Sequence, residues 1–266
     1  MAASILHVSD LHAGTEEEPD VEAALAALAA RVEPELVVAS GDLTHRGRRE
    51  QHARAARLLR SLGPPVLAVP GNHDLPYAFP KRFTQPWAEF EREWTTTEPT
   101  YSSKSLHVVG LNSARPFRQQ GGALRREQLE GAAVRLRAAP PGALRVAVLH
   151  HHLIGAPWRA ARKRPVSHRG RVLGALVDAG AELVLAGHIH QSAVAERREF
   201  AVLDGDDTRM SVAAIAPGLG RPRPHRLGEA RGLQHYEASE RALVVRTYVW
   251  RGGDWAAVAE RSYARG

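Results

Sequence analysis

Asp, Asn and His residues gather in short clusters that are spread over most of the chain. The clusters are Ser9-Asp10-Leu11-His12, Gly41-Asp42, Gly71-Asn72-His73-Asp74, His150-His151-His152 and Gly187-His188-Ile189-His190. Carboxylate and imidazole groups together suit borderline divalent metals such as Mn, Fe, Co or Zn better than Mg or Ca, which prefer oxygen ligands. The chain contains no cysteine, so any metal site must be built from His, carboxylate or amide ligands. The clusters therefore predict metal chemistry.

Each cluster follows an apolar run of strand length. The runs are Ile5–Val8, Leu36–Ala39, Val66–Val69, Val146–Leu149 and Leu183–Ala186. In open α/β sheets the carboxyl ends of parallel strands meet in one crevice, which brings residues that are distant in sequence together. We therefore expect the clusters to form one site.

The number of candidate ligands indicates two metal ions. The candidates are Asp10, His12, Asp42, Asn72, His150, His188 and His190. Seven ligands are too many for one tetrahedral zinc, but they suit two adjacent ions that share a bridging carboxylate. Within the first and last clusters the paired ligands sit at i and i+2, so in an extended segment they would project to the same side. Glycines at 41, 71 and 187 would allow sharp turns and close approach there.

Plainer roles exist for several of these residues. Asp10 and Asp42 could be N-caps of following helices, Asn72 could be a turn residue, and Asp74 could cap or brace the next segment. Only one of the three consecutive histidines is expected to be a direct ligand, and His150 is chosen because it directly continues the apolar run.

Other histidines carry less weight. His151 and His152 are plausible supports behind the ligands, although their roles stay open. His7 lies inside an apolar run and His45 flanks a predicted helix, so packing roles are expected for both.

The elements that position these clusters read as an α/β fold. The apolar runs are continuous, which is typical of strands covered on both faces. Helical periodicity predicts helices over Val21–Val32, with Asp20 as N-cap, and over Glu50–Leu62, Arg125–Ala138 and Gly170–Ala179. Alternating character predicts further strands at Ser105–Leu111 and Arg241–Trp250.

A four-layer α/β/β/α sandwich with mixed sheets would accommodate these elements. We expect one domain over residues 1–266, with the strands after about residue 195 completing the second sheet. The Pro-, Gly- and Arg-rich stretch from Pro217 to Gly232 reads as a long loop that could border the active site.

The order of the clusters resembles the signature of the calcineurin-like metallophosphoesterase superfamily. That signature, D-x-H, G-D, G-N-H-D or E, H, and G-H-x-H, is present in full from Asp10 to His190. The V-S-D-L-H opening and the H-H-H and G-H-I-H closings most resemble class III cyclic-nucleotide phosphodiesterases and related bacterial phosphodiesterases. The family commonly has proline soon after the single ligand histidine, whereas Leu153 and Ile154 stand close behind it here.

The resemblance implies a role for each ligand. Asp10, His12 and His190 would hold one metal ion, Asn72, His150 and His188 would hold the other, and Asp42 would bridge them. A metal-bridging hydroxide would attack phosphorus. His73 would stabilise phosphoryl charge or protonate the leaving oxygen, and Asp74 would help to orient its imidazole.

The function expected from the resemblance is hydrolysis of a cyclic nucleotide or another small phosphodiester with two divalent ions, Mn, Fe or Zn. Alternatives within the superfamily are a nuclease and a nucleotide-sugar pyrophosphate hydrolase. The alternative of another class is an inactive metal-binding or nucleic-acid-binding scaffold, against which the intact His73 argues.

Composition adds few constraints. The net charge is +7, but the basic residues are spread along the chain, with local density only at Arg159–Arg171 and Arg221–Arg226. A solvated basic face is the simpler reading, so a nucleic-acid partner is not favoured. No apolar run approaches the roughly 20 residues that span a bilayer, and no signal-type segment opens the chain, so a cytoplasmic location is expected without a membrane partner. The oligomeric state stays open.

Overall fold

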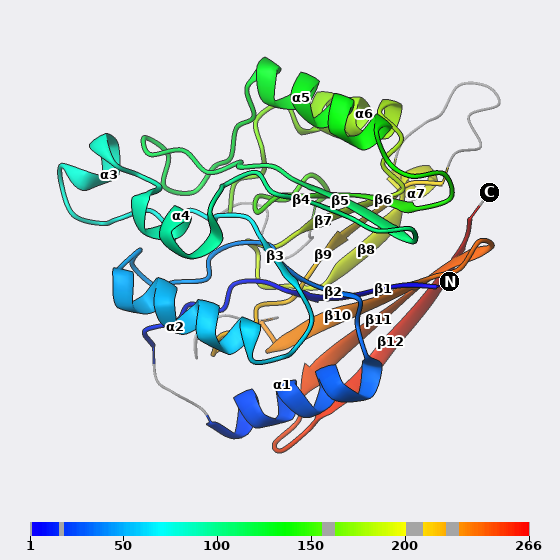
Figure 1. Ribbon diagram of the computed structural model, residues 1–266, viewed down its shortest axis with the longest axis horizontal. Helices are drawn as coiled ribbons and strands as arrows, with labels where there is room; N and C mark the ends of the chain where they lie inside the picture. The colour runs from blue at the N-terminus through cyan, green and yellow to red at the C-terminus, as the bar shows by residue number, and fades with distance from the viewer. Residues whose placement is uncertain (1, 16–18, 156–162, 201–209, 222–228, 266) are drawn as a thin grey trace.

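The computed structural model describes residues 2–15, 19–155, 163–200, 210–221 and 229–265, and it contains two mixed sheets that lie face to face (Figure 1). The first sheet has the order β12-β11-β10-β1-β2-β3, with bounds β1 (Ala3–Val8), β2 (Leu36–Ala39), β3 (Val66–Ala68), β10 (Gly232–Ala238), β11 (Ala242–Trp250) and β12 (Trp255–Ala264). β1, β2 and β3 run parallel, and β10 pairs antiparallel with β1.

The second sheet has the order β4-β5-β6-β7-β9-β8. Its strands are β4 (Thr100–Ser102), β5 (Leu106–Gly110), β6 (Leu144–Val148), β7 (Leu183–Ala186), β8 (Ala193–Glu196) and β9 (Val212–Ile215). The four strands β5, β6, β7 and β9 are parallel, and the edge strands β4 and β8 are antiparallel to their neighbours.

Helices cover the outer face of each sheet, as Figure 1 shows. The longer helices are α1 (Pro19–Val32), α2 (Arg49–Arg60), α5 (Arg126–Arg137) and α6 (Arg169–Asp178), and the short ones are α3 (Lys81–Thr84), α4 (Ala88–Trp94) and α7 (Arg197–Phe200). Leu25 of α1 and Leu59 of α2 belong to one apolar cluster with Val37 of β2. Leu136 of α5 and Leu176 of α6 pack in the same way against the second sheet.

The largest part of the core lies between the two sheets. Ile5 and Val38 of the first sheet share one buried cluster with Val108, Val146 and Leu185 of the second. β2 and β7 are buried at every residue, which is the pattern of strands covered on both faces. The predicted four-layer α/β/β/α sandwich with mixed sheets is therefore confirmed.

The predicted elements agree with the observed ones, with two differences. α1 begins at Pro19, so Asp20 lies in its first turn and is not the N-cap. The strands after about residue 195 were expected to complete the second sheet, but they divide between both sheets. β9 joins the second sheet, whereas β10 pairs with β1 and β11 and β12 extend the first sheet beyond it, where Trp255 packs in the same apolar cluster as Leu25 of α1.

Part of the predicted loop from Pro217 to Gly232 falls on residues 222–228, outside the described residues, as do Arg159 and Arg162 of the other basic segment. Among the described residues, no helix combines the length and apolar character that a bilayer-spanning segment needs.

A buried histidine joins three strands of the first sheet. His7 in β1 is fully buried, its Nε2 lies 2.8 Å from Ser40 Oγ just after β2, and its Nδ1 lies 3.4 Å from the Tyr236 hydroxyl in β10. The expected packing role of His7 is therefore observed, and it includes two polar contacts.

Burial lowers the pKa of His7 from 6.5 to about 3. Below about pH 6.5 the unfolded chain binds a proton at His7 that the folded chain excludes, which favours unfolding. The stability that neutral His7 provides is therefore complete above that pH and is lost as the pH falls toward 3. Between about pH 6 and 5 we expect the free energy of unfolding to drop by roughly 1 kcal/mol more in the wild type than in His7→Gln. Urea denaturation in EDTA measures how the free energy of unfolding changes with pH in each protein, and the same pH dependence in both would contradict the prediction.

Candidate metal centre

The predicted ligands all lie just beyond the carboxyl ends of parallel strands. Asp10 and His12 follow β1, Asp42 follows β2, Asn72 follows β3, His150 follows β6, and His188 and His190 follow β7. These strands belong to both sheets, so the site forms where the ends of the two sheets meet. None of the seven residues is more than 7% exposed.

One group of ligand atoms surrounds Asp10. Its Oδ1 lies 3.0 Å from His190 Nε2 and 3.9 Å from His12 Nε2. The two Nε2 atoms are 3.3 Å apart. Three ligand atoms that are this close can converge on a single cation.

A second group surrounds His150. Its Nε2 lies 3.4 Å from Asp42 Oδ2 and 3.2 Å from His188 Nδ1. Ligand atoms of Asp10, Asp42 and His150 also lie within 4.8 Å of one another, so the two groups are contiguous. The structure thus brings six of the seven predicted ligands into adjoining clusters, and Asn72 follows the neighbouring strand.

Three oxygens in this region are buried without a hydrogen-bond partner: Asp10 Oδ1, Asp42 Oδ2 and Asn72 Oδ1. The other oxygen of each carboxylate is held. Asp10 Oδ2 accepts hydrogen bonds from Ser9 Oγ at 2.7 Å and from the His188 N–H at 2.8 Å, and Asp42 Oδ1 accepts one from the His73 N–H at 2.8 Å. Buried acceptors without partners are costly. A donor set of such oxygens and imidazole nitrogens fits divalent metal ions of the borderline class.

The electrostatics keep the carboxylates ionised. Burial acts to raise the pKa of Asp10 and of Asp42, but the surrounding imidazoles outweigh it and hold both values well below the usual range. His190 contributes most of this lowering at Asp10, and His150 does so at Asp42. Two buried negative charges therefore face the centre.

The pKa values of the ligand histidines shift in two directions. Burial lowers the pKa of His12 to about 3 and that of His188 well below its usual range, so both rings are neutral, which is the form that binds metal. Burial acts in the same direction on His150, but Asp42 and Asp10 overcome it and raise the pKa of His150 to about 9.

Backbone carbonyls fix which ring nitrogens face the centre. His150 Nδ1 lies 2.8 Å from the Ser40 carbonyl, and His188 Nε2 lies 3.0 Å from the Gln120 carbonyl. Since a carbonyl can only accept, each of these nitrogens carries a proton, and the opposite nitrogen of each ring is directed at the ligand cluster.

The ligand loops are strained, and this corrects the expected extended geometry. The following ligands have positive φ angles, in the left-handed region: Asp10 (52°), His12 (51°), Asp42 (51°), His188 (77°) and His190 (56°). Non-glycine residues adopt this conformation at a cost. The paired ligands therefore converge through left-handed turns, not because i and i+2 share one side of a strand.

Two of the predicted glycines allow close approach. A Cβ on Gly187 would overlap Ser9 Oγ, and one on Gly71 would overlap the Asp42 carboxylate. The alternative reading of Asp10 and Asp42 as N-caps fails, because α1 begins only at Pro19 and α2 at Arg49.

His73 lies beside the ligand cluster, with its ring edge-on to His12 at a centroid distance of 4.9 Å. Its Nδ1 lies 3.0 Å from the His45 carbonyl and 3.1 Å from the Tyr77 hydroxyl. These contacts fix the ring and leave Nε2 as its reactive nitrogen. Asp74 was expected to orient this imidazole, but the groups that do so are His45 and Tyr77.

Asp74 instead braces the loops that follow β2 and β3. Its carboxylate accepts hydrogen bonds from the Leu43 and Thr44 N–H groups at 3.2 and 2.9 Å, from Thr44 Oγ1 at 3.0 Å and from the Gly71 N–H at 2.8 Å. Burial raises the pKa of this carboxyl, and the backbone hydrogen bonds act against that shift. The side chain thus joins the segments that carry Asp42 and Asn72.

The histidines left open by the sequence pack around the ligands. His151 Nδ1 lies 2.9 Å from Ser113 Oγ, and its ring centroid is 4.6 Å from that of His188. The His152 ring stacks on His188 at 5.9 Å. His45, expected to serve in packing, lies next to His73 with ring centroids 6.1 Å apart. Its place three residues after Asp42, in the same loop, was the signal that could have identified it.

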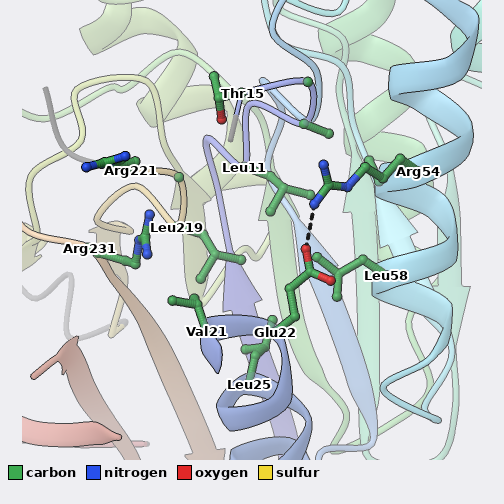
Figure 2. Close-up of a pocket in the computed structure, with 14 residues that line it drawn as sticks. Leu11, Thr15, Val21, Glu22, Leu25, Arg54, Leu58, Leu219, Arg221 and Arg231 are labelled. Atoms are coloured by element: carbon green, nitrogen blue, oxygen red, sulfur yellow. Dashed lines mark hydrogen bonds and ion pairs between the residues drawn. The ribbon is translucent and has the colours of Figure 1, made fainter. Parts of the chain in front are cut away.

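A small cavity of about 50 Å³ is lined in part by Leu219, Gly220, Arg221 and Arg231 (Figure 2). Leu11, Val21 and Leu219 give it an apolar lining, and Arg54 pairs with Glu22 at 2.8 Å on one wall. It has room for a few water molecules but not for a nucleotide. The Gly220 N–H donates to the Asp10 carbonyl at 2.9 Å, so the described start of the predicted loop lies beside the centre.

Comparisons with known proteins agree with this geometry. The calcineurin-like phosphoesterase family matches residues 3–192. A probable cyclic nucleotide phosphodiesterase of Synechococcus sp. is 30% identical over 217 residues, which make up 74% of this chain and 77% of that protein.

Solved structures share the fold at low identity. The purple acid phosphatase PPD1 from yellow lupin superposes with a TM-score of 0.70 at 11% identity, over 100% of this chain and 54% of its own, so this chain spans about half of that protein. GAP50 of Plasmodium superposes with a TM-score of 0.67 at 10% identity, over 100% and 89% of the two chains. On the family match and the Synechococcus relative, this chain belongs to the calcineurin-like metallophosphoesterases, near the cyclic-nucleotide phosphodiesterase branch, and is a metal-dependent phosphoesterase.

Proposed function

We propose that this enzyme hydrolyses phosphodiester bonds of cyclic nucleotides or other small diesters at a centre that holds two divalent ions. The observation that carries the proposal is the set of buried, unpartnered oxygens of Asp10, Asp42 and Asn72 beside four histidines. The Synechococcus relative, named as a probable cyclic nucleotide phosphodiesterase, supports this substrate class.

In this proposal each group of ligands holds one ion. Asp10, His12 and His190 hold the first, as their mutual distances of 3.0 to 3.9 Å support. Asn72, His150 and His188 would hold the second, and Asp42 would be shared between the two groups. Mn, Fe or Zn suits this mixed set of oxygen and nitrogen ligands. Bound ions of this kind lower the pKa of water and offset phosphate charge.

The protein supplies orientation and proton transfer. His73, fixed through Nδ1, presents Nε2 toward the substrate and protonates the leaving oxygen. Asp74 is a positioning residue that holds the loops of Asp42 and Asn72 at a constant separation.

The rival functions use the same ligands. A nuclease or a nucleotide-sugar pyrophosphate hydrolase would share the whole centre, so only a substrate panel separates them. GAP50, described as an anchor in the inner membrane complex of Plasmodium, has this fold, so fold alone does not establish catalysis. The nearly complete convergence of ligands around His73 favours an enzyme over a scaffold.

Removing the bridging carboxylate should abolish turnover. With Mn(II), we expect the wild type to hydrolyse bis(p-nitrophenyl) phosphate and to bind two ions per chain, and we expect Asp42→Ala to lose roughly 10³-fold or more in kcat, together with at least one ion. Release of p-nitrophenol and elemental analysis measure the two effects. Asp20→Ala, at an exposed carboxylate, is the matched control. Full activity of Asp42→Ala would overturn the two-ion centre.

The substrate class is tested on the same preparation. Cyclic AMP, single-stranded DNA and a nucleotide-sugar diphosphate are compared by kcat/KM. We expect cyclic AMP or another small diester to exceed DNA and the diphosphate, and the reverse order would favour one of the rival enzymes.

His73→Gln distinguishes proton donation from binding. Because p-nitrophenolate leaves readily without a proton and a ribose alkoxide does not, we expect kcat to fall roughly 10²- to 10⁴-fold for cyclic AMP and less for bis(p-nitrophenyl) phosphate. Metal content serves as the check that the centre is intact. Equal losses on both substrates would exclude His73 as the general acid.

Asp74→Asn replaces one acceptor oxygen by a donor that faces N–H groups. We expect a loss of about 1–3 kcal/mol in the free energy of unfolding, together with weaker metal retention. Chemical denaturation and dialysis against chelator measure these effects, with Asp20→Asn as control. Unchanged stability would show that the four hydrogen bonds do not brace the loops.

A further inference from the structure

The exposed aromatic side chains of the described residues gather at one place. Tyr77 is 56% exposed, Phe79 83%, Phe83 41% and Phe117 84%. The Phe83 ring lies 6.2 Å from Phe79 and 4.9 Å from Phe117, between ring centroids. Contiguous exposed apolar surface is a feature of binding surfaces in soluble proteins. We call these four residues the aromatic rim.

The aromatic rim borders the metal centre through two loops. The Tyr77 hydroxyl lies 3.1 Å from His73 Nδ1. Phe117 lies three residues before Gln120, whose carbonyl is 3.0 Å from His188 Nε2. Arg82 Nε donates to the Pro116 carbonyl at 2.8 Å and so links the two loops. Figure 1 shows α3, which carries Phe83, at the margin of the molecule beyond α2 and α4.

A basic groove adjoins the aromatic rim. Its volume is about 420 Å³, and its charged lining residues are Arg46, Arg48, Arg49, Lys81, Glu50 and Glu89. Tyr77 belongs to both the groove and the rim. Arg46 follows His45, whose carbonyl contacts His73, so the groove starts beside the reacting centre. Its four cations outnumber its two carboxylates, which favours an anion.

We propose that the groove and the aromatic rim bind the second nucleotide of a linear dinucleotide that carries a terminal phosphate. A flat base stacks on the exposed rings, and the terminal phosphate lies among the arginines of the groove. A cyclic nucleotide has a single phosphate, which the metal centre occupies, so it would leave the groove unused. A phospholipid with a single headgroup phosphate would leave the groove unused in the same way. The inference deepens the proposed function and rests on it.

The reaction balances with water alone. The oxygen of one water bonds to the phosphorus of the internucleotide diester, the P–O3′ bond breaks, and the 3′ oxygen leaves with a proton. A 5′-phosphorylated dinucleotide is thereby converted into two 5′-mononucleotides. The groove and the rim contribute binding and orientation to this step.

The test compares kcat/KM of a 5′-phosphorylated deoxyadenosine dinucleotide with that of bis(p-nitrophenyl) phosphate and of cyclic AMP. We expect the wild type to prefer the dinucleotide over cyclic AMP by tenfold or more. The double variant Phe83→Ala/Phe117→Ala should lower the ratio of dinucleotide to bis(p-nitrophenyl) phosphate turnover roughly tenfold, mainly through KM, as should Arg46→Gln/Lys81→Gln. Val134→Ala and Val258→Ala remove exposed apolar side chains elsewhere and should leave the ratio unchanged.

The outcomes separate the two proposals. If the wild type hydrolyses bis(p-nitrophenyl) phosphate but not the dinucleotide, or if the double variants keep the wild-type ratio, the dinucleotide site is wrong while the phosphodiesterase stands. Aromatic variants that keep the ratio but lose binding to anionic phospholipid vesicles would assign the rim to a membrane surface and also overturn the inference. A wild type that hydrolyses none of the three substrates fails the proposed function itself.

Discussion

Two buried carboxylates govern the organisation of this protein. Asp10 and Asp42 are fully buried at the end of the sandwich, and nearby imidazoles keep both ionised although burial acts in the opposite direction. Each uses one oxygen for hydrogen bonds within the protein, while the other oxygen lacks a hydrogen bond and faces an imidazole nitrogen, His190 Nε2 at 3.0 Å from Asp10 and His150 Nε2 at 3.4 Å from Asp42. An arrangement of this kind is unfavourable unless a cation compensates the charge. A bound metal ion would offset the free-energy cost of burying these two carboxylates.

The surrounding fold holds this charge in place. Strands of both sheets end at the same edge, and the turns that follow them adopt left-handed conformations at Asp10, His12, Asp42, His188 and His190. Close backbone approach at Gly71 and Gly187 leaves no room for a side chain between adjacent ligand loops. The rigid core between the sheets can sustain such strain, because β2 and β7 are buried over their whole length.

The loops around the centre differ from the core in that they are exposed to solvent. Its loops present exposed rings and a basic groove, and such solvent-facing side chains contribute little to the packing of the core. Each rim loop nevertheless contacts a histidine of the centre, Tyr77 at His73 and Gln120 at His188. These two hydrogen bonds join the rim loops directly to the rings of the centre.

The sequence by itself determined the sandwich and the candidate ligands. Continuous apolar runs followed by Asp, Asn or His identify strand ends without any long-range information, because an apolar run and the residues after it are features of the local sequence. Short or polar strands such as β4 and the largely exposed β12 carry no such pattern, and they escaped prediction.

Only the tertiary structure decided how the parts meet. It placed β10, β11 and β12 in the first sheet. It showed that Tyr77 and the His45 carbonyl, and not Asp74, contact the His73 ring. It also showed that His45 lies beside His73 at the edge of the centre. These outcomes depend on contacts between segments that are distant in sequence or on the path of a loop after its strand ends. Neither is encoded in local periodicity, since a loop takes its conformation from the groups that surround it.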